Sequence, residues 1–119
     1  MQLVRMETLA SIMPLTESDA YNALMYLVNT DEEAAQAKAL YNGLEDAKKT
    51  VEAMAFMDST GSAAERKQNA LSSKVYLDHI KKIENALLDY ETLRNKRSTA
   101  ALQIELWRSV NSNRNKGNI

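Results

Sequence analysis

The side chains of this sequence that could do chemistry are mostly basic, and they gather between residues 94 and 116. On a helical wheel of 100° per residue, Arg94, Arg97 and Arg108 fall within about 60° of one another, with Trp107 about 100° further round. Arginines near an aromatic ring suit contact with phosphates and stacking on unpaired bases. The pattern predicts a nucleic-acid-binding set made of Arg94, Lys96, Arg97, Trp107, Arg108, Arg114 and Lys116.

This set also has structural interpretations. Packing in a core is favoured over base stacking for Trp107, because an aromatic residue at helical spacing is most often a core residue. Arg94 and Arg108 each follow a glutamate by three residues, Glu91 and Glu105. The arginines could therefore form a salt-bridge seam between chains instead of contacting phosphates, and both interpretations stay open.

The residues that most catalytic and metal sites need are missing. The sequence has no cysteine and a single histidine, His79, which excludes thiolate, disulfide and paired-histidine sites. It has neither a glycine-rich phosphate loop nor a strained nucleophile turn. The run Asp31 to Glu33 could bind a hard cation. The favoured interpretation is that these acidic side chains stabilise the positive end of a helix dipole. We expect no enzymatic activity, no cofactor and no metal.

The composition is that of a globular helical protein. Hydrophobic residues make up 45% and charged residues 26% of the 119 residues, and three glycines with one proline are too few for an all-β fold.

The net charge of −1 is the sum of an acidic first half and a basic second half of the chain. Residues 1–60 hold four Lys/Arg and ten Asp/Glu, a net of −6, and residues 61–119 hold eleven and six, a net of +5. Such asymmetry indicates either a polyanionic partner or helices that pair their charges.

Apolar spacing and capping residues predict the helices of the first half. Residues 3–13 carry a short apolar stripe of Leu3, Met6, Leu9 or Ala10, and Met13, which Pro14 ends. Thr16 can cap a second helix whose residues 20–28 are apolar nearly all round. Thr30 and Glu33 form a capping box, where a new helix begins or the preceding one continues. An apolar stripe then runs from Ala34 to Met54.

The second half begins at a break over residues 58–62. Gly61 can take the left-handed conformation that closes a helix, and Ser62 with Glu65 forms a capping box. A further break at Ser72-Ser73 is possible, and one long helix is then predicted from Val75 to about Val110. The apolar stripe of this helix has one charged member, at Arg97, and reads Tyr76, Ile80, Ile83, Leu87, Tyr90, Leu93, Arg97, Ala100, Ile104 and Trp107.

A second apolar face near the end of this helix predicts a second packing partner. It consists of Leu102, Leu106 and Val110. One partner is expected to be the helix over residues 31–57 and the other a second copy of the chain, although the N-terminal helix could supply the same cover. We therefore predict an all-α, coiled-coil-like antiparallel hairpin with a short N-terminal helical segment, assembled as a homo-oligomer. Residues 1–110 would form one domain and residues 111–119 a flexible basic tail.

The chain gives no signal for a membrane or for export. Arg5 and Glu7 interrupt the region where a signal peptide needs an apolar core, and no apolar run approaches the ~20 residues of a membrane span. We expect a cytoplasmic location and no membrane partner.

Several short motifs lie in the second half of the chain: Gly61-Ser-Ala-Ala-Glu65-Arg66-Lys67, Ala70, Tyr76, Tyr90-Glu91-x-Leu93-Arg94, Ile104-Glu105-x-Trp107-Arg108-Ser109 and Asn113-Arg114. In these motifs the chain resembles small helical proteins of tailed-phage genomes, some of which resemble accessories of recombination and single-strand-DNA metabolism. The resemblance implies a DNA-associated helper in the host cytoplasm, and it transfers no catalytic residue.

The leading hypothesis is a non-enzymatic accessory of phage DNA recombination or replication that binds DNA, preferably single-stranded, through its basic C-terminal region. The alternative is a helical adaptor or inhibitor that docks on a host or phage enzyme, suggested by the second apolar face. A virion or assembly component is a third, weaker hypothesis.

Overall fold

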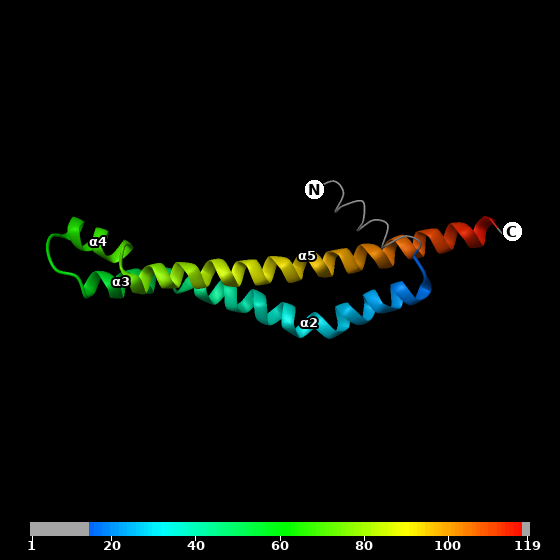
Figure 1. Cartoon of the computed structure of the whole chain (residues 1–119), viewed down its shortest axis with the longest axis horizontal. Helices are drawn as coiled ribbons and strands as arrows, with labels where there is room; N and C mark the ends of the chain where they lie inside the picture. Colours follow the sequence, from blue (N-terminus) through cyan, green and yellow to red (C-terminus); the bar gives the residue numbers. More distant parts are fainter. Residues whose placement is uncertain (1–14, 118–119) are drawn as a thin grey trace. The chain divides into compact units, whose positions relative to one another are not determined.

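The computed structural model describes residues 15–117, and this part of the chain is helical without any strand. The helices are α2 (Glu17–Asp46), α3 (Lys48–Met57), α4 (Ala63–Leu71) and α5 (Lys74–Gly117) (Figure 1). The prediction of an all-α fold is confirmed. The predicted helix over residues 3–13 lies outside the described residues.

Polar side chains cap the first turns of three of these helices, and two of the caps, at Thr16 and Ser62, were predicted from the sequence. The Thr16 hydroxyl accepts a hydrogen bond from the backbone N–H of Asp19 at 3.1 Å, and the Asp19 carboxylate accepts one from the N–H of Thr16 at 2.9 Å. Ser62 accepts from the N–H of Glu65 at 3.2 Å, and Ser73 accepts from the N–H of Tyr76 at 3.3 Å. Each cap satisfies an amide that the first turn of a helix leaves without a partner.

The capping box predicted at Thr30 is not a helix start, because α2 runs through it without a break. The Thr30 hydroxyl donates backwards to the carbonyl oxygen of Tyr26 at 2.7 Å instead of accepting from a following amide. A threonine in a helix interior commonly bonds in this way to the carbonyl four residues earlier. Of the two alternatives, the continuous helix is therefore the one observed.

An interruption at Ala47 divides the helix predicted over residues 31–57 into the end of α2 and the whole of α3. The predicted apolar stripe is half-buried from Ala34 to Val51. After the interruption, Met54 is 61% exposed and the neighbouring Ala55 is buried. The face that packs inward in α3 is therefore displaced by one residue from the predicted one.

The break between α3 and α4 is a tight turn around Gly61. Gly61 has a φ of +110°, a backbone conformation that side chains with a Cβ rarely adopt, so its predicted role is confirmed. Beyond the turn, the Arg66 guanidinium stacks on the Phe56 ring at 4.4 Å and donates to the Ser59 carbonyl at 3.1 Å. These contacts fix α4 against α3, and the two helices lie side by side (Figure 1).

The described residues fall into two compact units, and the prediction of one domain over residues 1–110 stays a prediction. Unit 1 comprises residues 15–32 and 94–117, and unit 2 comprises residues 33–93. In unit 1 the two helical segments are antiparallel, with Ala20, Ala23 and Ala100 buried between them. Alanines allow a close approach of helix backbones but bury little surface each. The division arises because α2 and α5 each contribute separate segments to both units.

Unit 2 has an antiparallel pair of its own between the second part of α2 and the first part of α5. The Tyr41 and Tyr90 rings stack with centroids 6.0 Å apart. Further along this pair, the buried ring of His79 is hydrogen-bonded through Nε2 to the Leu44 carbonyl at 2.7 Å. The other buried side chains of this unit are Ala55, Ala70, Ile83 and Ala86.

At the end of the described chain, α5 continues to Gly117, so it includes most of the segment predicted to be a flexible tail. Residues 111–116 are therefore helical. Arg114 and Lys116 occupy the last turn, where positive side chains interact favourably with the negative end of the helix dipole. The asparagines of this segment are weak helix formers, which is why the sequence pattern pointed to a tail.

Candidate nucleic-acid interface

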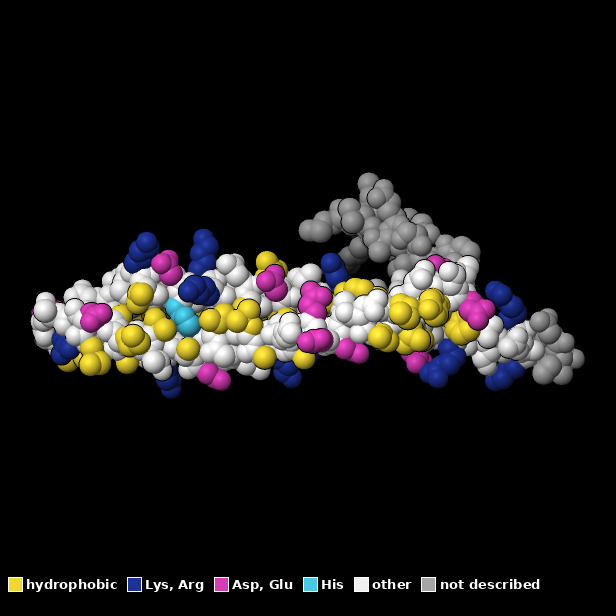
Figure 2. Space-filling model, turned by 90° about the horizontal axis from the view of Figure 1, so that it is seen from below, with side chains coloured by type: hydrophobic (Ala, Val, Ile, Leu, Met, Phe, Trp, Pro, Cys, Tyr) yellow, Lys and Arg dark blue, Asp and Glu magenta, His cyan; other side chains and the backbone are white. Residues whose placement is uncertain are grey.

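All seven residues of the predicted nucleic-acid-binding set lie on the segment of α5 that belongs to unit 1. Five of them are exposed, and two are half-buried, namely Arg97 and Trp107. In Figure 2, dark-blue basic side chains lie on opposite sides of the molecule at the end that carries the last turns of α5. The exposed members are Arg94, Lys96, Arg108, Arg114 and Lys116.

Arg97 is engaged within the chain. Its side chain is 23% exposed, and one guanidinium nitrogen donates both to the Leu27 carbonyl at 2.8 Å and to the Thr30 hydroxyl at 2.7 Å. The other terminal nitrogen forms an ion pair with Asp31 at 2.5 Å. The planar guanidinium thus holds three acceptors of α2 at once, a task that suits arginine rather than lysine. We therefore remove Arg97 from the set of side chains available to a phosphate.

Arg108 is exposed and pairs with Glu105 at 2.6 Å, within the same helix. Both side chains are more than 60% exposed, at 69% and 63%, so water and salt screen the pair and it contributes little to stability. The spacing that predicted a seam between chains therefore produces a local pair three residues apart. Such a pair can open to let Arg108 contact another anion.

Trp107 lies on the side of α5 that faces α2. It follows the buried Ala100 by seven residues, which places the two about 20° apart on the helical wheel. Together with its half-burial, this position favours the packing interpretation of Trp107. For a base to stack on the indole, the Trp107 side chain would have to turn away from the side of α5 on which Ala100 is buried.

The segment of α5 in unit 1 carries an excess of positive charge in its own sequence. Glu105 is the only carboxylate between residues 94 and 117, against six Lys and Arg, which gives this segment a net charge of +5. After Glu105 the charged residues are Arg108, Arg114 and Lys116. Their positions on the helical wheel are spread around the axis, so the cations surround the end of the helix.

The predicted oligomer interface is exposed in the single chain. Leu102, Leu106 and Val110 are 69%, 41% and 39% exposed. The expected apolar face therefore exists, and its pairing with a second copy stays a prediction.

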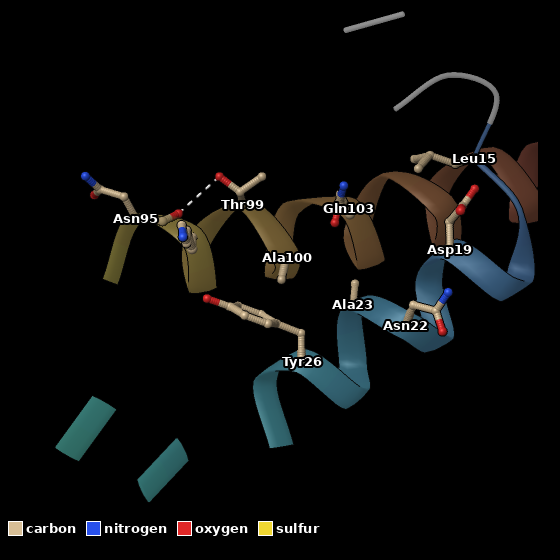
Figure 3. A pocket seen from close by; sticks show the side chains of 10 residues that line it. Leu15, Asp19, Asn22, Ala23, Tyr26, Asn95, Thr99, Ala100 and Gln103 are labelled. Atoms are coloured by element: carbon tan, nitrogen blue, oxygen red, sulfur yellow. Dashed lines mark hydrogen bonds between the residues drawn. The ribbon is translucent and has the colours of Figure 1, made fainter. Parts of the chain in front are cut away.

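Unit 1 also contains a groove that the sequence did not indicate. It has a volume of about 570 Å³, and the side chains of Asn95, Thr99 and Gln103 line it along α5 (Figure 3). Its floor contains the buried Ala23 and Ala100, and its other lining residues are Leu15, Asp19, Asn22, Tyr26 and Lys96. The small residues at the middle of both apolar stripes were the signal that could have predicted it.

A second groove lies between α3 and α4 in unit 2. It measures about 590 Å³, and Phe56, Met57 and Ala63 supply apolar walls with Lys49, Glu52 and Lys67 among its other lining residues. Met57 is 75% exposed. The described residues contain no group of three acidic, histidine or cysteine side chains able to hold a metal ion.

Among the described residues, no helix combines the length and apolarity needed to cross a membrane. No family model, curated protein or solved structure matches the chain.

Proposed function

We propose that this chain is a non-enzymatic accessory protein of phage DNA recombination or replication, which binds DNA through the exposed cations of α5. The observation that carries the proposal is the net charge of +5 on residues 94–117, with five of the six cations exposed. A dense local positive charge attracts a polyanion and releases its condensed counterions. The proposed contact residues are Arg94, Lys96, Arg108, Arg114 and Lys116.

The geometry fits contact with a backbone better than recognition of bases. From Arg94 to Lys116 the helix rises about 33 Å, which spans several phosphates of a nucleic acid. Trp107 is half-buried and lies about 20° round the helix from the buried Ala100, which favours packing over base stacking for its ring. Binding should therefore tolerate changes of sequence and depend steeply on salt.

A fluorescence-anisotropy titration with a labelled oligonucleotide, single-stranded in one arm and double-stranded in the other, tests the proposal. If five cations contact phosphates of a single strand, log K should fall with log salt with a slope of about −3.5, a loss of roughly 100-fold between 50 and 200 mM. The double variant Arg114→Ala, Lys116→Ala should flatten this slope by about 1.4. No binding at micromolar protein in low salt, or binding without a salt slope, would refute the proposal.

The matched control uses two exposed lysines of the same helix in unit 2. The double variant Lys81→Ala, Lys82→Ala removes the same amount of charge as the variant at residues 114 and 116. It should leave both the affinity and the salt slope unchanged. An equal loss in both variants would mean that net charge, and not the end of α5, drives the binding.

A second candidate function is that of a helical adaptor, and the groove between α3 and α4 favours it. Figure 2 shows hydrophobic side chains, in yellow, on the surface of these two helices. Exposed methionines adapt their shape to a partner, and Met54 and Met57 are 61% and 75% exposed. A protein partner captured from nuclease-treated lysate, and lost with Met57→Gln, would support this function in place of DNA binding.

A further inference from the structure

The groove in unit 1 has an apolar floor and an apolar extension on one side of α5. Ala23 and Ala100 in its floor are 6% and 5% exposed. On the helical wheel, Thr99, Gln103, Leu106 and Val110 fall within about 60° of one another. The exposed Leu106 and Val110 therefore continue the side that Thr99 and Gln103 line, and these four residues form one face of α5, called here the docking face.

The first described residue of the chain lines this groove. Leu15, the first described residue, lines the groove at the end near Gln103, and Asn95 lies at the other end (Figure 3). Residues 1–14 are thus attached at the mouth of the groove. A tethered segment has an effective concentration in the millimolar range, which favours it over a free competitor of equal affinity.

The sequence of that segment matches the face in pattern and in length. Leu3, Met6, Ala10 and Met13, together with Leu9, fall within about 120° on a helical wheel. Thirteen residues of helix span about 20 Å, and the face from Asn95 to Val110 is about 22 Å long. Two of these residues are methionines, whose flexible side chains fill irregular apolar gaps.

From these observations we infer that residues 1–13 form an amphipathic helix that docks on this face and completes unit 1 as a three-helix bundle. The helix would run from Asn95 toward Val110, parallel to α5, with Met6 at the level of Gln103. The proposal goes beyond DNA binding and does not depend on it. A second copy of the chain is the competing occupant of the same face.

The absence of cysteine makes a disulfide test direct, because every thiol would be an engineered one. In the full chain, Met6→Cys is combined with Gln103→Cys, and the control combines Met6→Cys with Ala101→Cys. Ala101 is exposed and lies about 160° round the helix from Gln103, at nearly the same height. After mild oxidation, mass spectrometry should find at least ten-fold more intrachain disulfide in the first pair than in the control.

A measurement on the unsubstituted chain keeps the inference testable if the cysteine variants fold poorly. Hydrogen exchange of the amides of residues 3–13 should be at least ten-fold slower than in an unstructured peptide of the same sequence. Exchange at the unstructured rate would overturn the inference. Equal cross-linking in the two cysteine pairs, or disulfides found only between chains, would also overturn it, and the second of these outcomes would assign the face to another copy.

Discussion

Replacing Arg97 by methionine should destabilise the protein by about 2 kcal/mol. A hydrogen bond from a charged group contributes roughly 1.5–3 kcal/mol, but the Asp31 partner is 65% exposed and its ion pair is worth at most about 1 kcal/mol. The Thr30 hydroxyl keeps its bond to Tyr26, so no buried donor is left without a partner. Methionine retains much of the apolar stem, which limits the loss to the lost acceptor contacts.

Thermal and urea unfolding of the full chain measure this change. For a chain of 119 residues, a loss of 2 kcal/mol corresponds to a fall in Tm of roughly 8 °C. The control Lys96→Met replaces the neighbouring exposed cation and should change stability by no more than about 0.5 kcal/mol. If Arg97→Met and Lys96→Met had equal stabilities, the contacts of Arg97 with α2 would not matter for folding.

The same variant separates a structural role for Arg97 from a role in binding. Because its guanidinium is committed to Leu27, Thr30 and Asp31, Arg97→Met should leave the salt slope of DNA binding unchanged. A slope flattened by about 0.7 would show that Arg97 contacts a phosphate, and it would contradict the assignment made from its hydrogen bonds.

Three other substitutions test the local structure by urea unfolding. Gly61→Ala should destabilise by about 1 kcal/mol, because φ is +110° and the added Cβ would meet the Glu65 carboxylate; unchanged stability would show that the turn tolerates a side chain. Gly43→Ala should stabilise by roughly 0.8 kcal/mol, because nothing lies within 4 Å of the added Cβ inside α2; a loss of stability would reveal a close contact there. His79→Ala should destabilise by about 1–3 kcal/mol, since the Leu44 carbonyl loses its partner, and His79→Gln should recover part of the loss.

The parts of the fold that the sequence predicted are those set by local chemistry. The turn at Gly61, the cap at Ser62 and the start of the last helix after Ser73 follow from backbone freedom and from side chains that bond nearby amides. The prediction was ambiguous at Thr30, where the same residue type can cap a helix or bond backwards within one. In the structure the Thr30 hydroxyl also accepts a hydrogen bond from Arg97, 67 residues away, a contact that the residues around Thr30 do not reveal.

The positive charge of the candidate site could be predicted from the sequence, but which of its side chains are exposed could not. The sequence pattern placed Arg97 both in the apolar stripe and in the nucleic-acid-binding set. In the structure its side chain is mostly buried and paired with Asp31, as expected of a member of the stripe. A charged residue within an otherwise apolar stripe indicates either a partner on the facing helix or a break in the packing, and nothing within α5 itself distinguishes these. The groove escaped prediction because it depends on which alanines of two separate segments meet.

Two of the proposed DNA contacts, Arg94 and Arg108, lie on the side of α5 opposite the docking face, whereas Lys96 lines the groove itself. Taking the direction of the buried Ala100 as the reference, Arg94 and Arg108 lie about 120° and 80° round the helix on one side. Gln103, Leu106 and Val110 lie about 60° to 120° round on the other side. A helix docked on the second side would leave both arginines exposed to a phosphate backbone. It would also add apolar burial to a unit whose buried side chains, among the described residues, are alanines, and so hold rigid the segment that carries the cations.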